Sequence, residues 1–124
     1  MKVLLDTSFL VSVVQNKIDL NMELRKFGRP EIFVLDLVIN ELKSLSDGRG
    51  VDARNAGIAL QFLGREGIPV LRAGAGHTDT LLMEYAQKRG MSVCTIDRRL
   101  KDDLLAKGIE VITIRQNRYL VRTG

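Results

Sequence analysis

The chain has 124 residues, of which 45% are hydrophobic, and carries a formal net charge of +4. This length predicts a single domain over residues 1–124, and no apolar run is long enough to cross a bilayer. The single cysteine excludes a disulfide framework and favours a reducing cytoplasm, and with only one histidine a Cys/His zinc site is excluded and a histidine-based triad is disfavoured. The positive charge favours an anionic partner such as nucleic acid.

Short β-branched segments alternate with helical patterns along the whole chain. In chain order we predict a strand over Lys2–Leu5, helices over Ser8–Gln15 and Leu20–Phe27, a strand over Ile32–Leu35, helices over Leu37–Leu45 and Val51–Arg65, a strand over Pro69–Leu71, a helix over Thr78–Arg89, a strand over Val93–Ile96, a helix over Arg98–Lys107 and a strand over Val111–Ile114. We expect Arg115–Arg122 to follow as a basic tail. The alternation indicates an α/β fold, a three-layer α/β/α sandwich around a central sheet of five parallel strands.

Four acidic residues stand at or beside apolar segments, where a carboxylate is costly unless it has a partner. Asp6 and Asp97 each follow a predicted strand, Asp79 opens a predicted helix, and Glu41 falls on the apolar stripe of another helix. In open parallel sheets, sites form beyond the carboxyl ends of the strands. If the four acids converge there, their like charges require a divalent cation.

Each acid also has a purely structural interpretation. Asp6 and Asp97 suit the N-cap of the helix that follows. Asp79 suits the first turn of its helix, where the macrodipole favours negative charge. Glu41 falls outside the polar face of its helix, and its structural interpretation is a salt bridge at the margin of the apolar stripe.

The four acids lie in motifs that resemble those of PIN-domain nucleases, over almost the full length of the chain. Leu4–Leu10 is similar to the first motif of that family, an apolar strand followed by Asp-Thr-Ser. Val38–Leu42 resembles the second motif, Thr78–Leu82 the third, and Val93–Asp97 the fourth, in which Thr-x-Asp closes a strand. The resemblance implies a PIN-like fold and a metal-dependent ribonuclease.

By this resemblance Asp6, Glu41, Asp79 and Asp97 are the catalytic, metal-binding acids. Ser8 and Thr95 are implied as supporting hydroxyls that orient carboxylates or waters. The implied cofactor is one or two Mg²⁺ or Mn²⁺ ions, because oxygen-only ligands favour these metals. The implied partner is RNA, and a homodimer or ribonucleoprotein partners are compatible with it. The residues expected to contact RNA are Arg49, Arg54, Arg98, Arg99 and Lys101.

One position departs from the pattern of many PIN nucleases, the toxin–antitoxin ribonucleases in particular. Two residues after Asp97 they carry a further acid, and here that residue is Arg99. Together with the run from Asp97 to Lys101, this resembles more closely the PIN nucleases of small-subunit ribosomal RNA processing. The alternatives are a toxin ribonuclease and a non-catalytic RNA-binding PIN module. The sequence lacks the motifs that identify phosphotransferase, receiver and P-loop folds.

Overall fold

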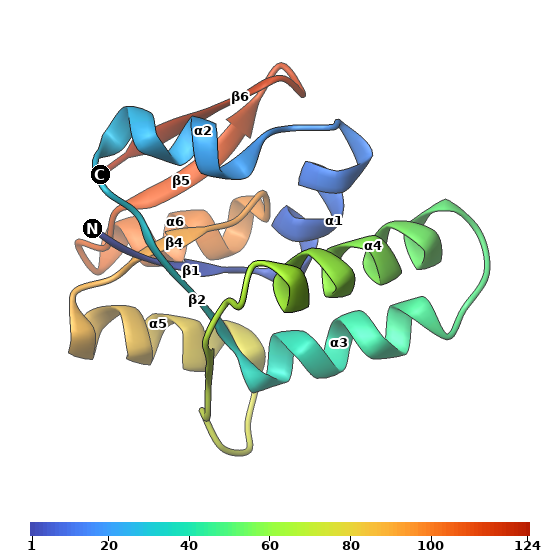
Figure 1. Cartoon of the computed structure of the whole chain (residues 1–124). Coiled ribbons are helices and arrows are strands. Elements are labelled where there is room, and N and C mark those ends of the chain that lie inside the picture. Colours follow the sequence, from blue (N-terminus) through green and yellow to red (C-terminus); the bar gives the residue numbers. More distant parts are fainter.

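A six-stranded sheet runs through the molecule, and the computed structural model describes all of residues 1–124 (Figure 1). The strand order is β3-β2-β1-β4-β5-β6. The strands are β1 (Lys2–Leu5), β2 (Glu31–Leu35), β3 (Val70–Leu71), β4 (Ser92–Cys94), β5 (Val111–Arg115) and β6 (Tyr119–Thr123). The first five are parallel, as predicted, and β6 is antiparallel to β5.

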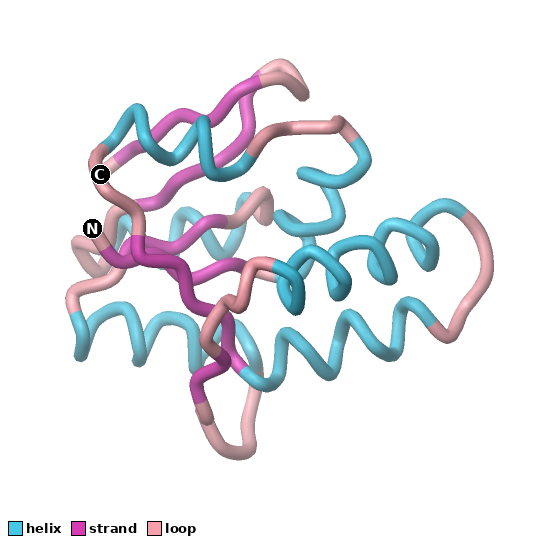
Figure 2. The backbone as a smooth tube through the Cα atoms, viewed as in Figure 1, coloured by secondary structure: helices cyan, strands magenta, loops and turns pink.

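Helices connect the parallel strands, and Figure 2 shows the alternation along the chain. They are α1 (Thr7–Gln15), α2 (Leu20–Leu24) with the 3₁₀ turn η1 (Arg25–Phe27), α3 (Asp36–Ser46), α4 (Val51–Arg65), α5 (Thr78–Arg89) and α6 (Arg98–Ala106). Helix α2 packs against β6, α5 against β4, and α6 against β5, while α1, α3 and α4 pack together. Helices α3 and α4 form a long antiparallel pair that extends to one side (Figure 1). No helix is long and apolar enough to span a membrane.

The chain end corrects the sequence prediction. The segment expected as a basic tail beyond the fifth strand turns back as a hairpin, and β6 pairs with β5 from Arg115 opposite Tyr119 to Val111 opposite Thr123. The turn places Gln116 and Asn117 at φ 55° and 54°. Hairpin turns of this kind usually contain glycine, because glycine adopts positive φ without a steric cost. The Gln-Asn pair carries no such signal, so the sequence pattern did not reveal the sixth strand.

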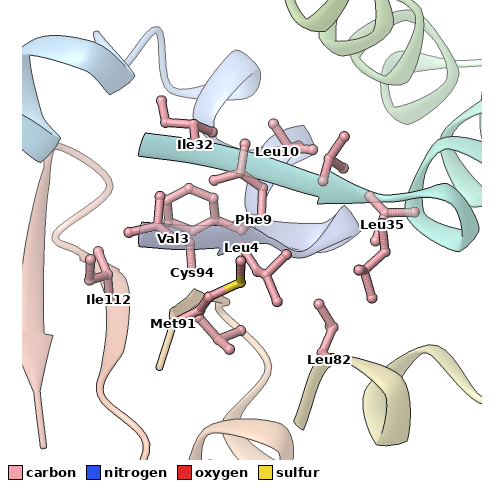
Figure 3. Close-up of a cluster of buried hydrophobic side chains, with 14 of the residues drawn as sticks. Val3, Leu4, Phe9, Leu10, Ile32, Leu35, Leu82, Met91, Cys94 and Ile112 are labelled. Atoms are coloured by element: carbon pink, nitrogen blue, oxygen red, sulfur yellow. The ribbon is translucent and has the colours of Figure 1, made fainter. Parts of the chain in front are cut away.

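The core lies on both faces of the central strands and contains 28 buried hydrophobic residues (Figure 3). Val3, Leu4 and Leu5 are all fully buried because β1 lies between β2 and β4 and helices cover the sheet. Cys94 on β4 is also fully buried, and burial raises the pKa of its thiol. Since β1 and β4 are parallel neighbours, the residues that follow them emerge at the same edge of the sheet.

Candidate functional site

An open cleft lies at the carboxyl edge of the sheet, with a volume of about 1060 Å³. All four predicted acids line it, each from a different element: Asp6 follows β1, Glu41 comes from α3, Asp79 from the start of α5, and Asp97 precedes α6. Residues from distant parts of the sequence therefore share one concave surface. The parallel arrangement of β1 and β4 brings Asp6 and Asp97 to the same edge, as the sequence predicted.

Asp6 is buried, with 7% of its surface exposed, and three donors hold its carboxylate. Oδ1 accepts a hydrogen bond from the Thr7 amide at 2.8 Å. Oδ2 accepts hydrogen bonds from the Thr95 hydroxyl at 2.7 Å and from the Ser8 hydroxyl at 3.2 Å. Burial raises the pKa of Asp6, while these three hydrogen bonds work in the opposite direction. Asp6 thus caps α1 and also presents a fixed carboxylate to the cleft.

Thr95 links the two acids that follow the central strands. Its side chain is fully buried, and its hydroxyl donates to Asp6 while accepting a hydrogen bond from the Asp97 amide at 3.0 Å. Asp97 in turn accepts from the Arg99 and Leu100 amides at 3.0 and 3.1 Å, and it caps α6. Capping and a place in the cleft are therefore compatible for both aspartates, and the structure shows both. Ser8 and Thr95 orient Asp6.

Glu41 is exposed, although the sequence pattern places it on the apolar stripe of α3. Its neighbour Leu42 is fully buried, but Leu45 is 41% exposed, so the apolar stripe of α3 narrows toward the C-terminal end of the helix. The Glu41 side chain faces the cleft and accepts hydrogen bonds from two hydroxyls. Thr7 donates to Oε1, and Thr78 donates to Oε2 at 3.0 Å. Glu41 thereby connects α3 to the starts of α1 and α5.

Asp79 lies in the first turn of α5 and caps nothing with its side chain. Partial burial raises its pKa, and the negative charges of Asp97, Glu41 and Asp103 add to the rise. The positive influence of His77 opposes it. Asp79 therefore experiences the electrostatic repulsion that the sequence predicted for converging acids.

The cleft has the donor chemistry of a site for a hard divalent cation. Its polar lining consists of carboxylate, hydroxyl and amide groups, with no lysine, arginine, histidine or cysteine. Oxygen donors of this kind suit Mg²⁺ or Mn²⁺. No three of the acids are arranged in the structure as a closed ligand set. The fit therefore rests on the donor types and on the shared cleft.

The sequence prediction missed several lining residues. Thr7 and Thr78 each stand directly before or after one of the four acids, and this adjacency is the signal that could have identified them as partners of Glu41. Asp52 also lines the cleft, from the first turn of α4. It enters the cleft because α3 and α4 pack as a pair, and no local pattern reveals that contact.

The basic residues expected to contact RNA flank the cleft residues in sequence but do not line the cleft. Arg49, Arg54, Arg98 and Arg99 are exposed, and Lys101 is half-buried. Arg98 and Arg99 directly follow Asp97, and Arg49 and Arg54 stand on either side of Asp52 along the chain. The cleft floor is thus acidic, and the cationic groups lie outside it.

The chain is similar to known ribonucleases over most of its length. It shares 26% identity with Ribonuclease VapC4 of Methanocaldococcus jannaschii over 122 residues, which cover 95% of this chain and 93% of that protein. It shares 32% identity with Ribonuclease VapC9 of Archaeoglobus fulgidus over 114 residues, which cover 91% and 82%.

Solved structures share the fold. The PIN domain endonuclease Utp24 superposes with a TM-score of 0.77 at 25% identity, covering 94% of this chain and 89% of Utp24. VapBC2 from Rickettsia felis, bound to a DNA fragment from its promoter, contains a chain that superposes with a TM-score of 0.66 at 16% identity, covering 93% of this chain and all of that one. The family model of the PIN-like domain matches residues 3–117. With this match and the 32% identical relative, the chain belongs to the PIN-like domain family.

Proposed function

We propose that this chain is a divalent-metal-dependent endoribonuclease whose catalytic residues are Asp6, Glu41, Asp79 and Asp97. The observation that carries the proposal is that one cleft collects these four carboxylates from four separate elements and is lined by no cationic side chain. The names of the two ribonuclease relatives support RNA as the substrate.

The side chains of the cleft differ in what they contribute. Three hydrogen bonds hold the Asp6 carboxylate in one orientation, so it is a fixed ligand position in the site. The Thr7 and Thr78 hydroxyls each donate to one carboxylate oxygen of Glu41 and so orient that side chain. Asp79 has a pKa raised by burial and by the neighbouring acids, so a nearby positive charge would stabilise its ionised form. When bound, Mg²⁺ or Mn²⁺ supplies a Lewis acid that activates water and offsets charge at the scissile phosphate.

The cleft does not provide for a nucleophilic side chain. Its serine and threonine hydroxyls have no histidine among the lining residues to act as a base. Two hydroxyls, those of Thr7 and Thr78, already donate to Glu41. Direct hydrolysis by water is therefore the reaction that suits these residues.

The substrate RNA belongs, in our proposal, to the processing type, with ribosomal RNA as the leading candidate. Arg99 supports this assignment, because it stands where a further acid is expected in toxin ribonucleases. The names of the two VapC relatives favour a second candidate, the toxin of a toxin–antitoxin pair. Induced expression in a bacterial host separates the two. A toxin arrests growth in a manner that depends on Asp6, whereas a processing enzyme leaves growth unchanged.

A cleavage assay tests the enzyme against the non-catalytic RNA-binding alternative. Wild-type protein is titrated with Mn²⁺ or Mg²⁺ in the presence of single-stranded RNA, alongside Asp6→Asn and Glu41→Gln. Asp102→Asn is the matched control, because Asp102 is an exposed acid of α6 outside the cleft. We expect metal-dependent cleavage by the wild type and the control, and none by the two cleft variants. Cleavage by Asp6→Asn at the wild-type rate contradicts the proposal.

A further inference from the structure

The turn between β5 and β6 carries cationic side chains that the fold does not use. Arg115, Gln116, Asn117 and Arg118 are all exposed. The Arg118 amide donates to the Arg115 carbonyl at 3.1 Å, which closes the turn. Neither arginine side chain forms a hydrogen bond, an ion pair or a cation–π contact within the chain; the single salt bridge of the molecule joins Lys26 to Glu23. Both guanidinium groups therefore remain available to a partner.

Strand β6 of the same hairpin, in contrast, is attached along its length to α2 and η1. Glu23 of α2 accepts a hydrogen bond from the Leu120 amide at 2.8 Å and pairs with Lys26 at 2.7 Å. The Lys26 ammonium lies 5.5 Å from the ring centre of Tyr119, and the Arg122 guanidinium lies 5.4 Å from that of Phe27. Arg122 is thus occupied in packing the hairpin against η1. The three arginines of this segment divide into one that anchors the hairpin and two that are free.

The free arginines lie on the same edge of the sheet as the acidic cleft. Strands β1, β4 and β5 are parallel neighbours, so Leu5, Cys94 and Arg115 all stand at carboxyl ends. Adjacent strands are about 4.8 Å apart, which separates the line of β5 from that of β1 by about 10 Å. Cys94 pairs with Ile112, and β5 continues from there to Arg115, about 10 Å farther along the strand. Figure 1 shows the turn projecting on the side of the molecule where α1 lies, away from both termini.

We propose that the β5–β6 turn is a substrate-binding arm, in which Arg115 and Arg118 bind backbone phosphates of the RNA strand near the bond that is cut. The proposal rests on the ribonuclease function proposed above and adds the path that the bound RNA strand takes across the surface. The floor of the cleft is acidic and repels phosphate, so an RNA strand needs cationic contacts outside it. Arg98 and Arg99, at the start of α6, directly follow Asp97, and α6 packs against β5, so they add positive charge next to the cleft.

Fluorescence anisotropy of a labelled single-stranded RNA of mixed sequence tests this arm without cleavage, in chelator and over a range of salt. The variant is Arg115→Gln with Arg118→Gln. The matched control is Arg29→Gln with Lys107→Gln, which removes the same charge from exposed residues before β2 and β5, at the opposite edge of the sheet. On a single strand, each phosphate that the protein no longer binds lowers the slope of log affinity against log salt by about 0.7, so two such phosphates lower it by about 1.4.

We expect the wild type to lose about sevenfold more affinity than the arm variant between about 50 and about 200 mM salt, which is the effect of a slope difference of about 1.4. The control keeps the wild-type slope. If both double variants show the same slope, the charges act only through net charge and the binding-arm proposal is refuted. Cleavage of RNA by the wild type would in that case still support the nuclease proposal. If the wild type neither binds nor cleaves RNA, the nuclease proposal fails and this inference fails with it.

Discussion

Replacing Thr95 with valine removes one buried hydroxyl and keeps the shape of the side chain. The hydroxyl donates to the Asp6 carboxylate at 2.7 Å and accepts from the Asp97 amide at 3.0 Å. A hydrogen bond to a charged group contributes about 1.5–3 kcal/mol. The exposed position of Asp97 lets water replace part of the second bond, so we expect Thr95→Val to lower the free energy of unfolding by about 2–3 kcal/mol. For this length that corresponds to a fall in Tm of about 8–12 °C.

The loss also depends on pH, because the acceptor is an ionised acid. Burial already raises the pKa of Asp6 above its ordinary value of 3.8, so stability falls as pH rises from that value through the raised one. The Thr95 bond counteracts this rise, and without it the pKa of Asp6 moves higher still. The gap in stability between the wild type and Thr95→Val is therefore widest at neutral pH and shrinks as Asp6 becomes protonated.

Denaturant unfolding at about pH 7 and at about pH 3–4, in chelator, measures this gap. Thr113→Val is the matched control, because Thr113 lies on the neighbouring strand β5 and its hydroxyl has no hydrogen-bond partner in the structure. The control should stay within about 0.5 kcal/mol of the wild type. A Thr95→Val variant as stable as the wild type, or a gap that does not change with pH, would refute the reasoning about the Asp6 network.

Two further predictions concern single groups. In chelator, Asp79→Asn should keep or raise Tm, because it removes repulsion from Asp97 and Glu41. The variant should also gain less Tm than the wild type when Mn²⁺ is added. A clear drop in the Tm of the variant in chelator would instead show that Asp79 mainly stabilises the start of α5. The Cys94 thiol should react with an aromatic disulfide reagent only as fast as the protein unfolds, because it is fully buried with a raised pKa; rapid labelling of the folded protein would contradict its place in the core.

The sequence predicted the parts of the fold that depend on local patterns. Apolar runs such as Val3–Leu5 identified the parallel strands, and the position of Asp6 and Asp97 directly after two of them placed both acids at one edge. These predictions succeeded because strand length, hydrophobicity and helix capping are short-range properties. The expected relation to PIN-domain proteins is confirmed by the family match.

What the sequence could not show depends on interactions between distant elements. Glu41 was expected in the cleft, but its two hydroxyl partners, Thr7 and Thr78, come from other elements and were not predicted. Asp52 enters the cleft only because α4 packs beside α3. The hairpin at Gln116 escaped prediction because its residues adopt positive φ without the glycine that usually marks such a turn.

Isothermal titration of the metal-free protein with Mn²⁺ tests most directly whether the four acids form one metal site. Wild-type protein is compared with Asp6→Asn, Glu41→Gln, Asp79→Asn and Asp97→Asn, and with Asp102→Asn as the acid outside the cleft. We expect saturable binding of one or two ions by the wild type and the control, and weakened or abolished binding in each of the four cleft variants. Binding that persists unchanged in all four, or that fails equally in the control, would contradict a shared metal site in this cleft.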